Sequence, residues 1–138
     1  MDPCYIFRRQ INMKATITAI AAIAMLMTGM AATEAMAAPE SKCKACHTFD
    51  QGGKHKVGPN LFGIVGSKAG STDFGRYSKS LENGDWVWSE DNLKAWVCDS
   101  KQAIKDLTGD ASAKTKMGNQ KKCGDDAEAV VSFLKTLK

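Results

Sequence analysis

Cys43-Lys44-Ala45-Cys46-His47 has the pattern C-x-x-C-H, which is the attachment signal for a c-type heme. The two thiols of such a motif add across the two vinyl groups of heme and form thioether bonds. Residues i, i+3 and i+4 share one face of a helical turn, so both thiols can reach the ring edge while His47 points at the iron. The motif therefore predicts one covalently attached heme c per chain, with His47 as an axial ligand of the iron.

Two other kinds of site use the same residue types. A redox-active C-x-x-C of the thioredoxin type belongs to an α/β chain, and the sequence around the motif shows no such pattern. A zinc site that adds His55 to the motif would place the adjacent Cys46 and His47 in one strained tetrahedron. The motif and its surroundings therefore favour heme attachment over both alternatives.

Residues 1–37 have the three parts of a secretory signal peptide. An apolar run of 13 residues at 15–27 suits the central part and is too short to span a bilayer. The small-x-small sequence at 35–37 is a cleavage site, and Met13 is an alternative start, because a complete signal begins there. A positively charged region precedes the run: Arg8, Arg9 and Lys14. An uncleaved membrane anchor is the alternative, but the short run and the cleavage site favour export to the periplasm with no stable membrane insertion afterwards.

Cleavage leaves residues 38–138 as a single domain of 101 residues. This domain keeps 16 of the 19 Lys and Arg residues and 13 of the 15 Asp and Glu residues. Such a mild positive charge does not indicate a nucleic-acid partner. The domain also keeps four of the five cysteines but only one of the seven methionines, Met117. A chain this short buries little apolar surface and often depends on a cofactor, a metal or a disulfide.

Two segments of the domain have clear helical patterns. Ser89 is a candidate N-cap for a helix with acidic residues in its first turn and an apolar inner face: Leu93, Trp96 and Val97. Asp125 or Asp126 is a candidate cap for a C-terminal helix with apolar residues at i, i+3, i+4 and i+7: Val130, Phe133, Leu134 and Leu137. Short helices are expected at 43–47 and 78–82. No segment alternates with period two, so the sequence predicts an all-α fold.

The second axial position of the iron has three candidate occupants: Met117, His55, or no protein group. His55 follows His47 by only eight residues in a loop rich in Gly and Lys, too close to reach the opposite heme face comfortably. Met117 follows His47 by 70 residues, in a polar loop where a methionine that merely fills a core gap would be out of place. We therefore expect His47 and Met117 to ligate the iron. With both positions filled, the iron has no site for a substrate, which favours electron transfer over catalysis.

Several separate motifs occur in the order found in one protein family. They are residues 43–48, the segment 52–61, Gly63, Gly66, Gly70, the pair 77–78, Trp88, and the segment 115–117. Through these motifs, residues 42–138 closely resemble class I cytochromes c, the mitochondrial and bacterial short-chain type. The resemblance implies the cytochrome c fold, in which short helices and loops wrap around one covalently bound heme. It also implies an electron-transfer protein rather than an enzyme.

The resemblance implies roles for the residues at matching positions. The carbonyl of Pro59 is expected to accept a hydrogen bond from the axial histidine and so to fix its tautomer. Tyr77 and Trp88 are expected to donate hydrogen bonds to a buried heme propionate, with Thr115 as a further polar contact on that side. His55 matches the histidine that bridges two loops in the family.

The sequence also departs from the family pattern. Trp96 stands where the family usually has a tyrosine near the methionine sulfur, so its N–H either takes that role or only packs there. Only residues 38–42 precede the motif after the predicted cleavage, whereas the family has a helix with an aromatic residue there. Either that helix is truncated, which would leave the C-terminal helix partly uncovered around Phe133, or cleavage lies further upstream. Ser67 stands where the family often has an arginine, and the segment between Trp96 and Met117 is longer than usual.

Cys98 and Cys123 are not used by the heme motif. They flank the segment that carries Met117, one toward the end of the helix after Ser89 and the other just before the C-terminal helix. In an oxidising compartment we expect them to form a disulfide, which chain-entropy reasoning values at roughly 3 kcal/mol for a loop of this size. Two free thiols or an intermolecular bond are the alternatives.

Lysines gather around the two ligand-bearing segments, while acidic residues gather at 82–91 and 125–128. In the family fold these lysines ring the exposed heme edge: Lys42, Lys44, Lys54, Lys56, Lys114, Lys116, Lys121 and Lys122. Such a ring would steer the protein onto acidic patches of a redox donor and acceptor; ordinary solubilising lysine is the alternative. We therefore expect a soluble, monomeric periplasmic carrier of single electrons. The alternatives are a dedicated heme subunit of a larger dehydrogenase or oxidase, and a peroxidatic or ligand-binding heme protein with a labile Met ligand.

Overall fold

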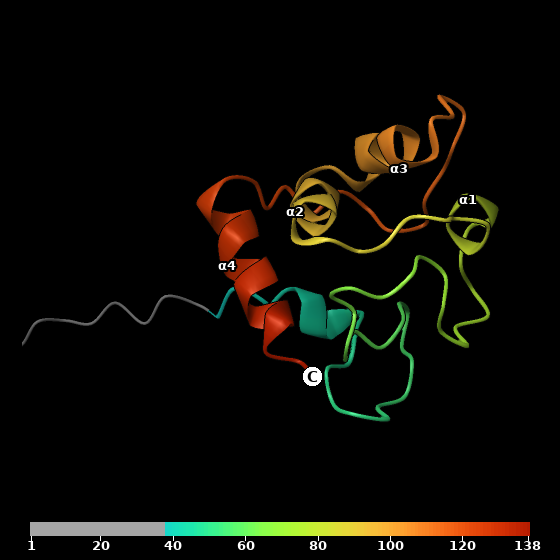
Figure 1. The fold of residues 1–138 in the computed structure, drawn as a ribbon. Helices are drawn as coiled ribbons and strands as arrows, with labels where there is room; N and C mark the ends of the chain where they lie inside the picture. Colours follow the sequence, from blue (N-terminus) through green and yellow to red (C-terminus); the bar gives the residue numbers. More distant parts are fainter. Residues whose placement is uncertain (1–37) are drawn as a thin grey trace, which may run out of the picture. The chain divides into compact units, whose positions relative to one another are not determined.

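The computed structural model describes residues 38–138, which form short helices joined by loops (Figure 1). In chain order the elements are the 3-10 helix η1 (Cys43–Ala45), α1 (Lys79–Glu82), α2 (Glu90–Cys98), α3 (Ser100–Thr108) and α4 (Asp125–Lys135). Within residues 38–138 the only extended pairing is an isolated antiparallel bridge between Lys68 and Val87. None of the described helices is long and apolar enough to cross a membrane. The signal peptide predicted at 1–37 lies outside the described residues.

Helix α2 has the start and the inner face that were expected after Ser89. The Ser89 hydroxyl accepts a hydrogen bond from the backbone N–H of Asn92 at 3.1 Å, which satisfies one of the free donors of the first turn. Helix α1 begins in the same way, with the Ser78 hydroxyl accepting from the N–H of Leu81 at 3.3 Å. The inward face of α2 is buried, as predicted: Leu93, Trp96 and Val97.

Helix α4 begins without the side-chain cap that was predicted. Gly124 occupies the cap position with φ of 56°, in the left-handed region that favours glycine, and no side chain caps the helix. Asp125 and Asp126 lie inside the first turn, so the expectation that one of them is the N-cap is wrong. Their carboxylates still face the positive end of the helix dipole, where negative charge is stabilising.

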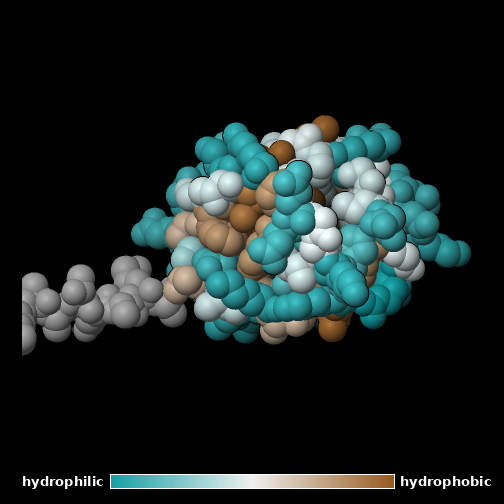
Figure 2. Space-filling model, turned by 90° about the horizontal axis from the view of Figure 1, so that it is seen from below, coloured by the Kyte–Doolittle hydropathy of each residue, from teal (hydrophilic) through white to brown (hydrophobic). Residues whose placement is uncertain are grey.

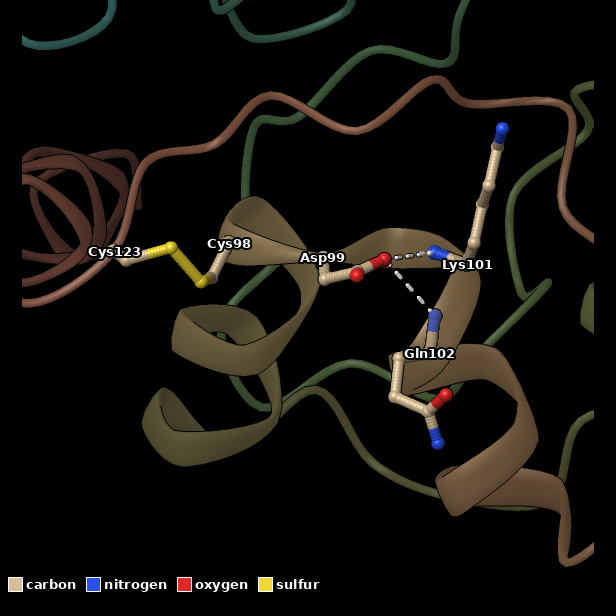
Figure 3. Close-up of a disulfide and its surroundings, with 5 residues drawn as sticks. All are labelled: Cys98, Asp99, Lys101, Gln102 and Cys123. Atoms are coloured by element: carbon tan, nitrogen blue, oxygen red, sulfur yellow. Dashed lines mark hydrogen bonds between the residues drawn. A yellow bond between two sulfur atoms is a disulfide. The ribbon is translucent and has the colours of Figure 1, made fainter.

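Helix α3 was not predicted, and it occupies much of the unusually long segment between α2 and Met117. Its N-cap is Asp99, whose carboxylate accepts hydrogen bonds from the N–H groups of Lys101 and Gln102, both at 3.1 Å (Figure 3). The helix ends at Gly109, which has φ of 68° and makes the left-handed turn common after a last helical residue. The additional residues of this long segment therefore form a helix.

The core lies where α2 packs against both α3 and α4 (Figure 1). Ile104 of α3 and Val131 of α4 are fully buried, and a fully buried aliphatic side chain contributes about 1.5–3 kcal/mol. The long loop region between η1 and α1 contributes fewer buried apolar residues, Ile64, Ala69 and Phe74. The loops therefore have little apolar packing of their own and depend on what they enclose.

An aromatic contact covers part of α4 around Phe133, where a truncated N-terminal helix would leave it open. The rings of Phe49 and Phe133 meet edge to face, with centroids 5.1 Å apart and an interplanar angle of 80°. Such pairs are worth about 0.5–1.5 kcal/mol beyond their area burial. Phe133 is half-buried as a result. Within the described residues, positions 38–42 form only turns, so Phe49 supplies an aromatic partner from the other side of the motif.

Cys98 and Cys123 are joined by a disulfide in the structure, with their Cα atoms 4.5 Å apart (Figure 3). Two backbone hydrogen bonds lie beside it, from the N–H of Lys121 to the carbonyl of Cys98 at 3.2 Å and from the N–H of Lys122 to that of Val97 at 3.1 Å. The end of the Met117 segment is therefore tied to the last turn of α2 by one covalent bond and two hydrogen bonds.

Candidate functional site

One cavity of about 440 Å³ collects every residue that the sequence predicted to bind the cofactor. A volume of this size lies within the range of cofactor pockets, about 300–1,000 Å³. Much of its wall is apolar and comes from the loops and from α2 and α4, including Leu61, Ile64, Leu93 and Leu134. The predicted residues that line it are Cys43, Cys46, His47, Pro59, Tyr77, Trp88, Trp96, Thr115 and Met117.

The C-x-x-C-H motif forms a single 3-10 turn, shorter than the helix expected at 43–47. The carbonyl of Cys43 accepts from the N–H of Cys46 at 3.0 Å and from that of His47 at 2.9 Å. Neither Cys43 nor Cys46 takes part in a disulfide, so both sulfurs remain for thioether bonds. Burial raises the pKa of the Cys43 thiol, with the Glu40 carboxylate adding to the effect. The tight turn brings both sulfurs and the imidazole to one cavity wall, as covalent attachment of a heme to this motif requires.

His47 is held in one orientation by the loop that follows it. Its Nδ1 donates a hydrogen bond to the carbonyl of Pro59 at 2.7 Å, which leaves Nε2 as the atom that can bind a metal. Gly58 packs so closely that a Cβ there would lie 2.8 Å from His47 Nδ1. Burial lowers the pKa of His47, although the hydrogen bond to Pro59 opposes that shift. The neutral imidazole that results is the form that ligates iron.

Met117 is held by contacts from α2, from the first residue of α3 and from Thr115, two residues before it in the chain. The indole N–H of Trp96 donates to the Met117 sulfur at 3.0 Å. The backbone N–H of Met117 donates to the Thr115 hydroxyl at 3.1 Å, and the Met117 carbonyl accepts from the hydroxyl of Ser100 at 3.0 Å. Ser100 is fully buried and was missed by sequence reasoning. No local signal marked it, because α3 itself was not predicted from the sequence.

Two tryptophans, Trp88 and Trp96, line the cavity beside Met117, and Trp86 packs behind Trp88. Trp88 and Trp96 meet edge to face with ring centroids 4.9 Å apart, and Trp86 meets Trp88 at 5.7 Å. Trp88 and Trp96 are both buried. Because the indole of Trp96 is packed against Trp88, its N–H is aimed at the Met117 sulfur by packing as well as by the hydrogen bond.

Tyr77 lies on the polar part of the cavity wall. Its hydroxyl shares a hydrogen bond of 2.7 Å with the hydroxyl of Thr72, and burial raises its pKa. The phenol therefore stays protonated and able to donate. This is the property that a hydrogen bond to a heme propionate needs, and it fits the role that the resemblance implies for Tyr77.

His55 lies outside the cavity and bridges two loops. Its Nδ1 accepts from the N–H of Asn60 at 2.9 Å, and its Nε2 contacts the carboxylate of Asp73 at 2.6 Å. Both ring nitrogens are used, which agrees with a structural histidine. The described residues contain no group of three or more His, Cys, Asp and Glu side chains that could hold a metal ion, as the zinc alternative would need.

The mouth of the cavity is basic with one exposed apolar residue. Val57 lines the cavity and is 70% exposed. Lys42, Arg76 and Lys116 line it as well. Figure 2 shows one face of the molecule, on which an apolar area lies among hydrophilic residues. A group held in the cavity would therefore meet solvent through a positively charged rim.

Comparison with known proteins agrees with this site. A family model described as Cytochrome c matches residues 30–138, starting within the segment predicted as a signal peptide. The chain belongs to the cytochrome c family. This cytochrome is 46% identical to cytochrome c2 of Rhodospirillum rubrum over 100 residues, which cover 70% of this chain and 74% of the relative. It is 40% identical to cytochrome c-550 of Paracoccus versutus over 107 residues, covering 68% and 67% of the two chains.

Two solved structures share the fold of this cytochrome. Ferric cytochrome c-550 from Paracoccus versutus matches with a TM-score of 0.59 and 36% identity, covering 71% of this chain and 90% of that one. Cytochrome c2 from Rhodospirillum centenum matches with a TM-score of 0.67 and 26% identity, covering 73% and 93%. The prediction of an all-α cytochrome c fold is therefore confirmed.

Family membership also confirms the class, the cofactor and the kind of activity that were predicted. The chain is a class I c-type cytochrome with one covalently attached heme c, and it transfers electrons rather than acting as an enzyme. The residues on the cavity wall fit this group. Two thiols on one turn, a neutral imidazole with a free Nε2, and an apolar enclosure are what heme c needs.

Proposed function

We propose that the chain is a soluble, monomeric periplasmic carrier of single electrons, with His47 and Met117 as ligands of the heme iron. One observation carries the proposal: both side chains line the same cavity, and each is held by a hydrogen bond. Pro59 accepts from His47, and Trp96 donates to Met117. Export is supported by the signal predicted from the sequence.

Bound heme c supplies the iron that takes up and releases one electron. The protein's part is to keep the ligands in place in both oxidation states, so that reorganisation stays small. Pro59 fixes the tautomer of His47, and the Ser100 and Thr115 hydroxyls hold the backbone of Met117. A neutral thioether raises the reduction potential relative to a second histidine. The N–H of Trp96 withdraws electron density from the sulfur and acts in the same direction.

Carbon monoxide tests this function against a ligand-binding or peroxidatic role. A carrier with both axial positions filled should show no carbon monoxide binding in its ferrous form at neutral pH. Met117→Ala should bind it, because the second position is then open. Val57→Ala is the matched control, since Val57 lines the cavity mouth without holding either ligand. Rapid binding by the wild type would contradict the carrier function and support the labile-ligand alternative.

We also propose that the basic rim docks on acidic patches of a donor and an acceptor. Lys42 and Lys116 line the cavity mouth, whereas two lysines of the predicted ring pair internally: Lys44 with Glu40 at 3.2 Å and Lys122 with Asp126 at 2.9 Å. Lys42→Gln should slow electron transfer with a partner at low salt, whereas Lys68→Gln, away from the cavity, should not. Rates independent of ionic strength would contradict steering by charge.

The alternative of a dedicated heme subunit rested on an open apolar face of α4. The contact between Phe49 and Phe133 covers part of that face, which favours the free carrier. Size-exclusion chromatography of the holoprotein should give a single peak at the size of one chain. Co-purification of a larger redox protein would favour the subunit alternative instead.

A further inference from the structure

Arg76 is the only arginine among residues 38–138, and it stands where the cavity opens. It is an exposed residue that nevertheless lines the cavity. Tyr77 and Ser78, which follow it in the chain, line the cavity too. Its guanidinium therefore sits at the boundary between solvent and the cofactor site, next to the polar part of the wall.

The Arg76 side chain is fixed by two contacts. Its guanidinium donates a hydrogen bond to the carbonyl of Lys56. Its Cζ also lies 5.3 Å from the centroid of the buried Phe74 ring, within the range of a cation–π interaction. A guanidinium has five N–H donors, so several remain after the one given to Lys56.

The backbone of Arg76 is tied to the segment that carries Met117. The Nζ of Lys116 donates to the Arg76 carbonyl at 3.0 Å. The carbonyl of Lys56 belongs to the loop that also provides Pro59, the acceptor for His47. Arg76 therefore connects the loop behind one proposed ligand with the segment behind the other.

Arg76 is one of three cationic residues that line the cavity, with Lys42 and Lys116. Lys116 donates to the Arg76 carbonyl and so lies beside it, whereas the acidic residue on the wall, Glu40, is paired with Lys44 at 3.2 Å. Lys42 directly precedes Cys43, whose thiol would bond to a vinyl group of heme and not to a propionate. Heme carries two propionates, and a carboxylate enclosed by apolar side chains is costly without a charged or hydrogen-bonding partner.

We propose that Arg76 is the electrostatic partner of a heme propionate and a determinant of the reduction potential. This inference rests on the proposed carrier function and adds a specific residue to it. The fixed positive charge disfavours the extra positive charge of ferric iron, so it raises the potential. It also stabilises the ionised form of the propionate. Protonation of the propionate, and the change in reduction potential that accompanies it, should therefore occur at lower pH.

Three variants test this role: Arg76→Gln removes the charge, Arg76→Lys keeps it, and Lys79→Gln removes a charge from an exposed residue of α1. Arg76→Gln should lower the equilibrium constant for one-electron reduction about three- to tenfold, which is about 28–59 mV. In Arg76→Lys and Lys79→Gln, the same equilibrium constant should stay within about twofold of the wild-type value. The pH at which the potential falls should move upward in Arg76→Gln only.

The proposal is overturned if Arg76→Gln changes the potential no more than Lys79→Gln, or if the pH profile does not move. Should Arg76→Gln fail to fold, a wild-type potential and pH profile in Arg76→Asn or Arg76→Ala would overturn it equally. The charge-transfer band of the methionine–iron bond should persist in Arg76→Gln. If the band were absent from the wild type, ligation of the iron by Met117 would be refuted. That result is distinct from an unchanged potential in Arg76→Gln, which would refute the role of Arg76 alone.

Discussion

Removal of the Cys98–Cys123 disulfide is expected to destabilise the protein strongly while leaving the heme attached. The disulfide closes a loop with a sequence separation of 25 residues that contains α3 and Met117. In the chain-entropy relation, a loop of this length loses about 12 cal/mol/K in the unfolded state, which is about 3.5 kcal/mol at 25 °C. For a domain of this size, that corresponds to a fall of about 14–28 °C in Tm.

Part of this loss of stability should be confined to the segment that carries Met117. The double variant Cys98→Ala/Cys123→Ala keeps the two backbone hydrogen bonds beside the disulfide, from Lys121 and Lys122. Their net worth is about 1 kcal/mol each, so the end of the Met117 segment stays attached to α2 near neutral pH. On heating, we expect the methionine–iron bond to be lost before the helices unfold, because the segment opens first.

Urea denaturation of the wild type and the double variant, followed by far-ultraviolet circular dichroism, measures the global effect. Intact mass before and after reduction and alkylation shows whether the wild type holds a disulfide at all. Cys4 lies within the signal peptide predicted at 1–37, so its thiol is expected in the mass spectrum only if that segment is retained. A difference in unfolding free energy below about 1 kcal/mol, or two free thiols in the oxidised holoprotein, would refute the reasoning.

Three further predictions follow from single contacts. Trp96→Phe removes the donor to the Met117 sulfur, so the reduction potential should fall by the equivalent of up to about 1 kcal/mol; an unchanged or higher potential in a redox titration would count against this. Phe49→Ala removes the aromatic cover of α4 and should cost about 2–3 kcal/mol in urea denaturation, whereas a loss below 1 kcal/mol would show that the contact matters little. The hydrogen bond from His55 holds the pKa of Asp73 below its ordinary value, so this contribution to stability is present above pH about 3.9 and is lost as the pH falls through the lower folded pKa. The Tm advantage of the wild type over Asp73→Asn should therefore shrink in acid, and a constant offset from pH 7 to pH 3 would contradict it.

The covalent motif and the helix with a standard cap could be predicted from the sequence because their signals are local. C-x-x-C-H specifies one turn and one chemistry, and Ser89 followed by two acidic residues specifies a helix start. Nine residues that the family motifs predicted to lie near the cofactor line one cavity. Motifs that occur in the family's order therefore predicted which distant residues come together.

Helix α3 escaped prediction because it follows α2 with only Asp99 between them. Asp99 ends one helix and caps the next, so the apolar period shifts at that point and the pattern looks interrupted. The cap of α4 was misassigned for a different reason. The chain enters that helix through Gly124 in a left-handed conformation, and an aspartate at the next position resembles a cap in sequence while lying in the first turn.

The contacts between distant segments could not be read from local patterns. Phe49 lies two residues after the heme motif, and nothing near it in sequence indicates that its ring meets Phe133 of α4. The hydroxyl of Ser100 reaches the carbonyl of Met117 for the same reason, since the disulfide and α3 fold the segment back. Such contacts depend on the tertiary arrangement, which residue spacing does not encode.

Ligation of the heme iron by both His47 and Met117 is tested most directly by the ferric absorption spectrum of the purified holoprotein. The weak charge-transfer band of a methionine–iron bond should be present in the wild type and in His55→Asn, and absent from Met117→Ala. The His55 variant serves as the control because His55 was the other candidate ligand, and both of its nitrogens bond elsewhere. A band that survives in Met117→Ala, or that is missing from the wild type, would contradict this ligation.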